Sequence, residues 1–102
     1  LQNPIRRSTL QRNLIDMFDK EELWEKLEEE ECLVADGFDD AIIGISHGIE
    51  PKAVYSVTKC IEVLLKEGMT EEDALEHFDF NVAGGYVGPK TPLFVYDYVE
   101  EL

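Results

Sequence analysis

The stretch from residue 56 to residue 82 most constrains the fold, because its apolar residues repeat with the spacing of two successive amphipathic helices. Ser56 is placed to cap the first helix, and Gly68 is placed to end it. This pattern predicts a helix over about 57–67. Its apolar residues recur at three- and four-residue intervals, as on one helix face: Val57, Cys60, Ile61, Leu64 and Leu65.

The helical pattern then restarts after a two-residue turn. Thr70 is placed to cap a second helix, and the three acids that follow it lie where the helix dipole favours negative charge. Met69 and Ala74 have the spacing of a hydrophobic staple. The stripe ends before Gly84, which predicts a second helix over about 71–83. Two antiparallel helices joined this tightly form an αα-hairpin.

Short runs rich in β-branched residues lie on both sides of the helix pair. Residues 41–47 and 52–55 flank a turn sequence and predict a β-hairpin over about 41–55. Residues 93–96 predict a last strand, which we expect to pair with the hairpin because an isolated hairpin is only marginally stable. The predicted fold is therefore α+β, with a small antiparallel sheet packed on the αα-hairpin.

An additional amphipathic helix is predicted at the N-terminal end, over about 9–30. Asp19 offers a second cap within it, so the segment forms either one helix or two helices kinked there, and we expect a continuous or gently kinked helix. The length predicts a single domain. It divides into a flexible arm at 1–8, a helical extension at 9–31, the α+β core at 32–97 and an acidic tail at 98–102.

The charge is strongly unbalanced, with 9 basic against 23 acidic residues and a net charge of −14. Such a field disfavours direct binding to nucleic acid and to anionic membranes, and it favours a partner with a basic surface. No apolar run reaches the roughly 18 residues of a membrane span, and no signal peptide pattern opens the chain. The two cysteines lack metal-binding spacing. These features predict a cytoplasmic protein without a cofactor.

Two motifs resemble known binding loops but lack the residues or the spacing that these loops require, and the two histidines lack the spacing of metal ligands. GGYVGPKT at 84–91 resembles a phosphate-binding loop, but Pro89 lacks the N–H that such a loop offers, and the flanking elements are reversed. DGFDD at 36–40 fails the EF-hand spacing. His47 and His77 have no second ligand at metal-binding helical spacing, and both are interpreted as surface residues. Helix geometry is expected to separate His77 from the nearby aspartate and asparagine at positions 79 and 81.

The aromatic residues leave two interpretations open. Trp24 is either a core residue on the apolar stripe or a contact in a homodimer formed through the N-terminal helix. The tyrosines are likewise candidates for contacts in a protein–protein interface. The candidate ligand or partner surface combines the glycine-rich loop, two aromatic residues outside it and the acidic helix end: Gly84, Gly85, Tyr86, Gly88, Lys90, Thr91, Tyr55, Trp24, Glu28 and Glu29.

A series of short motifs runs through residues 38–95: FDDAIIG, VYS, EGMTEEDA, FDFNV and GGYVG followed by TP. This series resembles a family of small uncharacterised bacteriophage and prophage proteins. The resemblance covers a little over half of the chain and excludes residues 1–37. It implies phage origin and a location in the host cytoplasm, and it brings no established activity. The matching positions are Asp39, Asp40, Ala41, Gly44, Tyr55, Gly68, Met69, Glu72, Ala74, Phe78, Phe80, Asn81, Gly85, Tyr86, Val87, Gly88, Thr91 and Pro92.

We therefore expect a non-enzymatic accessory protein that binds a host or phage protein with a basic surface. In a sharper form of this hypothesis, the carboxylates imitate DNA phosphates and inhibit a host nucleic-acid-binding protein. An alternative is a small-ligand or nucleotide-binding protein, in which the loop at 84–91 lines a pocket with Tyr55 and Tyr86; Lys90 would be its only nearby cation. An enzyme is the least favoured alternative, because the sequence contains no catalytic constellation.

Overall fold

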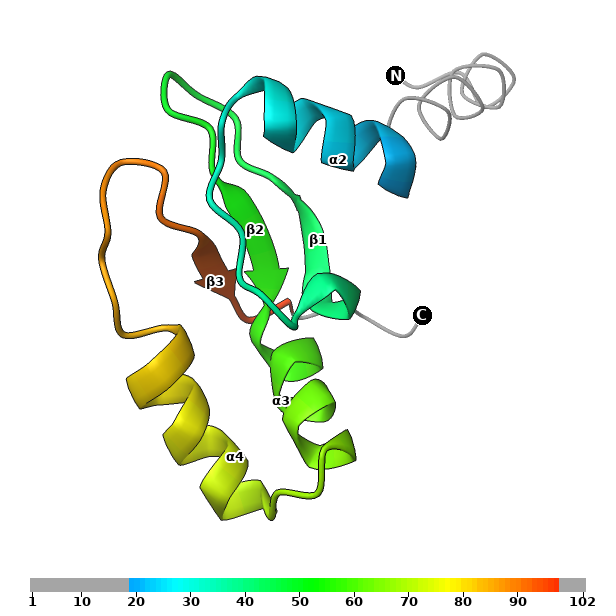
Figure 1. Ribbon diagram of the computed structural model, residues 1–102, viewed down its shortest axis with the longest axis vertical. Coiled ribbons are helices and arrows are strands. Elements are labelled where there is room, and N and C mark those ends of the chain that lie inside the picture. Colours follow the sequence, from blue (N-terminus) through cyan, green and yellow to red (C-terminus); the bar gives the residue numbers. More distant parts are fainter. Residues whose placement is uncertain (1–18, 98–102) are drawn as a thin grey trace, which may run out of the picture.

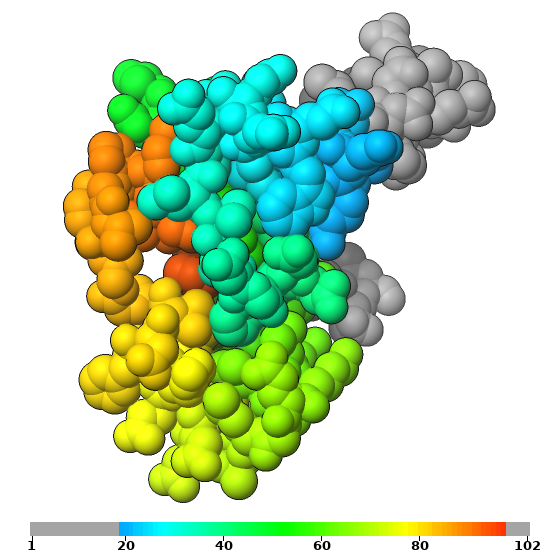
Figure 2. All heavy atoms as spheres, viewed as in Figure 1, coloured from blue at the N-terminus to red at the C-terminus, as the bar shows by residue number. Residues whose placement is uncertain are grey.

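The computed structural model describes residues 19–97, which form an α+β fold as predicted. Figure 1 shows α2 and the segment after it in front of a small sheet, with α3 and α4 side by side at one end, and Figure 2 shows that the atoms of α2 and this segment hide much of the sheet from this side. In chain order the elements are α2 (Lys20–Glu29), the 3₁₀ turn η1 (Asp39–Ala41), β1 (Ile42–Ile45), β2 (Ala53–Ser56), α3 (Val57–Lys66), α4 (Glu71–His77), the π-helical turn η2 (Phe78–Val82) and β3 (Leu93–Val95).

The sheet has the strand order β1-β2-β3 and is mixed. Strands β1 and β2 form the predicted antiparallel hairpin, but β3 runs parallel to β2, so the prediction of an entirely antiparallel sheet is wrong at this strand. Parallel neighbours need a long crossover connection. The helix pair and the loop after it supply this connection, because they return the chain to the end of the sheet where β2 begins (Figure 1).

The predicted αα-hairpin is confirmed, together with its capping residues. The Ser56 hydroxyl accepts a 3.1 Å hydrogen bond from the N–H of Lys59, and the Thr70 hydroxyl accepts one of 3.1 Å from the N–H of Asp73. Gly68 has φ +105°, a conformation that favours glycine. The second helix differs in one respect, because regular α-helix stops at His77 and the wider turn η2 follows.

The N-terminal helix is shorter than predicted. Asp19 has an extended backbone, with φ −74° and ψ 170°, and its carboxylate accepts a 2.8 Å hydrogen bond from the N–H of Glu22. This capping geometry starts α2 at Lys20, so a continuous helix through Asp19 is wrong. The predicted helix at 9–18, the arm at 1–8 and the tail at 98–102 lie outside the described residues.

One hydrophobic core joins these elements, and Tyr55 lies at its centre with none of its surface exposed. Its ring stacks on Phe94 with 5.5 Å between centroids, and Phe78 meets Phe94 edge-on at 5.3 Å. The Tyr55 hydroxyl accepts a 2.8 Å hydrogen bond from the N–H of Ala35. The core therefore joins the hairpin, the turn η2, β3 and the segment after α2 on a single face of the sheet.

Candidate functional site

The glycine-rich loop predicted as a candidate surface is closed by its own hydrogen bonds. The Thr91 hydroxyl accepts a 2.8 Å bond from the N–H of Val87 and donates a 2.7 Å bond to the carbonyl of Gly88. The N–H of Thr91 donates to the same carbonyl at 3.1 Å. Gly88 has φ +129°, which disfavours any residue with a Cβ. The backbone N–H groups of Val87 and Thr91 are thus engaged within the loop, as in a structural turn.

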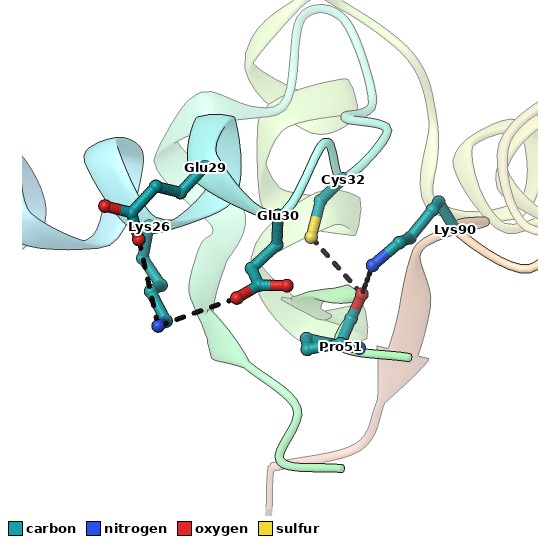
Figure 3. A network of polar contacts seen from close by, with 6 residues as sticks. All are labelled: Lys26, Glu29, Glu30, Cys32, Pro51 and Lys90. Carbon is teal, nitrogen blue, oxygen red and sulfur yellow. Dashed lines mark hydrogen bonds and ion pairs between the residues drawn. The ribbon is translucent and has the colours of Figure 1, made fainter. Parts of the chain in front are cut away.

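The carbonyl of Pro51 joins three segments that are far apart in the sequence (Figure 3). It accepts hydrogen bonds from the Lys90 ammonium at 3.2 Å and from the Cys32 thiol at 3.3 Å. The N–H of Leu33 also donates to the carbonyl of Lys90 at 3.3 Å. Lys90, the only cation of the predicted loop, therefore fastens this loop to the β-hairpin and to the segment after α2.

Tyr55 and Tyr86 do not form the predicted pocket. Tyr55 is completely buried, whereas Tyr86 is 77% exposed. Burial raises the pKa of the Tyr55 hydroxyl, and the hydrogen bond from Ala35 partly opposes that increase. Placing Tyr55 on an accessible surface is therefore wrong, and of the two tyrosines only Tyr86 is available to a partner. Gly84 and Gly85, which precede it, are also exposed.

Trp24 packs partly against the core and keeps one exposed edge. It lines a shallow depression of about 270 Å³ together with Leu27, Cys32 and Val34. Glu28 borders the same depression and is exposed. The core interpretation of Trp24 therefore holds for most of its side chain, and its exposed edge lies beside the acidic end of α2.

The acidic end of α2 is only partly neutralised. Lys26 lies 3.9 Å from the Glu29 carboxylate and 3.6 Å from that of Glu30, and Figure 3 shows its ammonium between the two. These are the only ion pairs within residues 19–97. Three other lysines instead donate to backbone carbonyls: Lys20 to Asp39, Lys52 to Glu50 and Lys90 to Pro51.

A groove on α4 and η2 is the feature that the sequence interpretation missed. Its volume is about 380 Å³, and its apolar part includes Phe80, which is 77% exposed. Residues two positions apart lie on nearly opposite sides of a helix. Because Phe78 points into the core, Phe80 points outward. This could have been predicted from the sequence. The groove is lined by Met69, Asp73, Glu76, His77, Phe80 and Asn81.

His77 and Asn81 meet within this groove. The Asn81 side-chain nitrogen lies 3.2 Å from Nδ1 of His77. The expected separation of these two side chains is wrong, since residues four positions apart are neighbours on a helix surface. The pair orients the imidazole within the groove, whose lining also includes Asp73 and Glu76.

Burial affects the thiols of both cysteines. Burial raises the pKa of the Cys60 thiol to about 11. Burial also raises the pKa of the Cys32 thiol, although the charge of Lys90 partly opposes this. Both thiols are therefore weak nucleophiles near neutral pH. Within residues 19–97, no three side chains of histidine, cysteine, aspartate or glutamate are arranged to hold a metal ion.

Comparisons with known proteins add no assignment. No family model, no curated protein and no solved structure matches the chain. Among residues 19–97, no helix has the length and apolar character needed to cross a membrane.

Proposed function

We propose that this chain is a bacteriophage accessory protein that binds a basic surface of a host or phage protein. The uncompensated negative charge of the described surface is the observation that carries this proposal. Residues 19–97 contain 20 acidic residues and 6 lysines. Most of these carboxylates have no cation beside them in this part of the chain, since only Lys26 forms ion pairs there. The resulting field favours association with a positively charged partner.

The groove on α4 and η2 supports a specific binding position for such a partner. Phe80 and Met69 provide an apolar surface, and Asp73 and Glu76 place exposed carboxylates beside it. An arginine of the partner has the matching chemistry, because its guanidinium stacks on an aromatic ring while donating hydrogen bonds to carboxylates. Exposed aromatic residues are also common among the residues that dominate protein interfaces.

A sharper form of the proposal is that the protein acts as a host-directed inhibitor by imitating DNA. The exposed acids of α2 and the first turn of α4 present many charges without a compensating cation among the described residues. A host protein with a basic DNA-binding cleft would encounter the same sign of charge as on a phosphate backbone. Duplex DNA should then compete with this protein for the partner.

The nucleotide-binding alternative has less support. The loop at 84–91 uses the N–H groups of Val87 and Thr91 internally, and Lys90 is bonded to Pro51. Tyr55 is also unavailable to a ligand. These contacts leave the loop with few of the donors that a phosphate group requires.

Capture of a partner from bacterial lysate on the immobilised full chain tests the proposal. The doubly substituted variant Asp73→Asn/Glu76→Gln removes two charges at the groove. Its matched control, Glu62→Gln/Glu67→Gln, removes two exposed charges from α3 and the residue that follows it. A protein retained by wild type and by the control, but lost from the groove variant, supports binding at the groove. Equal retention by the two variants contradicts the groove as the binding position, and no specific capture by wild type contradicts the proposed function.

A further inference from the structure

The sheet has a second face, on the side opposite to the hydrophobic core. Figure 1 shows α2 and the segment after it in front of one side of the sheet. Tyr55 and its parallel neighbour Phe94 point into the core on that side. Because side chains alternate along a strand, Val54 and its neighbour Leu93 point to the other side, and Val95 does the same.

Strand β1 contributes one further apolar residue to this second face. The register between β1 and β2 shifts between Ile42 and Gly44, so Ile43 is the additional residue of a β-bulge. The buried Ile42 points into the core, whereas Ile43 is 39% exposed and does not pack on the core cluster. We define the outer sheet face by its four apolar residues, none of which belongs to that cluster: Ile43, Val54, Leu93 and Val95.

We propose that a second copy of this chain covers the outer sheet face, so that two copies pack sheet on sheet as a symmetric dimer. A sheet face left in water normally carries polar side chains, whereas an apolar face is typical of a sheet with a second covering layer. A two-fold dimer supplies this layer from a single surface, because both copies use the same patch.

The distribution of charge favours a second copy at this face. The chain has 23 acidic residues, but none of them lies in β1, β2 or β3, and these strands contain no lysine or arginine. Contact through the helices of two chains, each with a net charge of −14, would instead bring acidic surfaces together. Contact through the uncharged strands therefore involves less electrostatic repulsion.

Opposite charges mark the two ends of the outer sheet face. Lys52 comes two residues before Val54, and Asp97 comes two residues after Val95, so strand alternation places both charges on this side. They lie at opposite ends because β2 and β3 are parallel. Neither residue forms an ion pair within residues 19–97. A two-fold axis across the strands would bring Lys52 of each copy to the partner's Asp97, which gives the dimer a defined orientation.

Two other occupants fit the outer sheet face less well. A partner with a basic surface would find no carboxylate on the strands, so the charges that favour its binding act elsewhere on the molecule. A dimer through Trp24 would use the opposite side of the sheet, because Trp24 packs against the core cluster. The dimer proposed here is therefore distinct from both associations.

The size of the outer sheet face predicts a weak dimer. Its three strands have four, four and three residues. At about 4.8 Å between strands and about 3.3 Å per residue, they cover roughly 14 Å by 13 Å. Stable interfaces bury about 800 Å² on each partner. We therefore expect a reversible dimer that forms at high protein concentration.

Sedimentation equilibrium of the full chain at two salt concentrations tests the proposal. The screening length falls from about 10 Å at 0.1 M salt to about 3 Å at 1 M, which weakens the repulsion between copies and leaves the apolar contact. We expect a monomer–dimer equilibrium with an association constant that rises several-fold with salt, whereas binding of a basic partner should fall. A monomer under both conditions at millimolar protein overturns the proposal, and so does a dimer that weakens with salt.

Two matched variants locate the contact. Ile43→Glu/Leu93→Glu places two charges on the outer sheet face of each copy and should abolish the dimer. The control Leu65→Glu/Leu75→Glu adds the same charge at similarly exposed apolar positions of α3 and α4, and it should dimerise several-fold more strongly than the outer-face variant. Equal association of the two variants, whether retained or lost, overturns the proposal.

Intermolecular nuclear Overhauser effects in the wild-type chain provide a test that needs no variant. A sample that mixes two differently labelled populations detects only contacts between copies. We expect contacts among the methyl groups of Val54, Leu93 and Val95 under the conditions where sedimentation detects the dimer. Contacts confined to other residues, or no contacts between copies under those conditions, overturn the proposal.

Discussion

The hydroxyl of Ser56 donates a 2.7 Å hydrogen bond to the carboxylate of Asp97, across the ends of two parallel strands. The same hydroxyl accepts the N–H of Lys59 and so caps α3. Ser56 is completely buried. The Ser56 side chain therefore holds the start of α3 next to the end of β3. The whole crossover connection runs between these two points.

Removing the Asp97 carboxylate should destabilise the fold. We expect Asp97→Ala to lower the free energy of unfolding by about 1.5–3 kcal/mol, because the buried Ser56 hydroxyl loses a charge-assisted acceptor. Asp97→Asn should cost less, since an amide oxygen can still accept. Urea unfolding measures both changes. The exposed Asp79→Ala should stay within about 0.5 kcal/mol of wild type, and an equal loss for Asp79 and Asp97 would contradict the role of this bond.

The hydrogen bond from Ala35 to Tyr55 should also be measurable. Tyr55→Phe leaves the partly buried N–H of Ala35 without its acceptor, which should cost about 1–3 kcal/mol of unfolding free energy. Tyr86→Phe is the matched control, because it removes the same hydroxyl from an exposed ring and should have almost no effect. Chemical denaturation compares the two variants. Equal stability of both would mean that the segment after α2 is not held by Tyr55.

Two adjacent glycines should respond differently to a methyl group. A Cβ at Gly84 would lie 2.7 Å from the carbonyl oxygen of Asp79, whereas a Cβ at Gly85 would meet nothing within 4 Å. We expect Gly84→Ala to lower the free energy of unfolding by about 1–3 kcal/mol through the displaced backbone. Gly85→Ala should be neutral or slightly stabilising. Thermal unfolding of the two variants checks this order, and the reverse order would contradict the backbone path after η2.

The buried thiol of Cys60 should make stability fall at alkaline pH. Its pKa is about 11 in the folded protein, above the ordinary value of 9.0, so the unfolded chain loses this proton first as the pH rises. The contribution is complete below about pH 9 and is lost between about pH 9 and pH 11, by about 3 kcal/mol in total. Cys60→Ala removes this titration. The difference in unfolding free energy between wild type and Cys60→Ala should therefore shrink across this range, and a constant difference would contradict the shifted pKa.

Much of the fold could be predicted because its signals are local. The caps at Ser56 and Thr70 and the turn at Gly68 depend on neighbouring residues, and each is confirmed. The direction of β3 depends instead on where a connection of two helices delivers the chain, which no local pattern specifies. Asp19 had the correct capping signal, and its extended backbone starts α2 at Lys20, although the apolar stripe alone predicted a helix that continues through Asp19.

The candidate site was less predictable than the fold. Tyr55 lies in a strand where alternation allows either face, and only its packing against Phe94 and Ala35 shows that it is buried. The hydrogen bonds of Lys90 and Cys32 to Pro51 join distant segments, so no spacing could reveal them. The pair of His77 and Asn81, by contrast, follows directly from a four-residue interval on a helix.

Salt-dependent release of a captured partner tests the central claim most directly. The screening length falls from about 10 Å at 0.1 M salt to about 3 Å at 1 M. If uncompensated carboxylates drive binding, a partner held by the full chain at the lower concentration should dissociate at the higher one, and excess duplex DNA should release it if the surface imitates DNA. Release by salt but not by DNA would contradict the imitation of DNA, but it would still support binding through the acidic surface. Equal retention of the partner at both salt concentrations would contradict binding through the acidic surface.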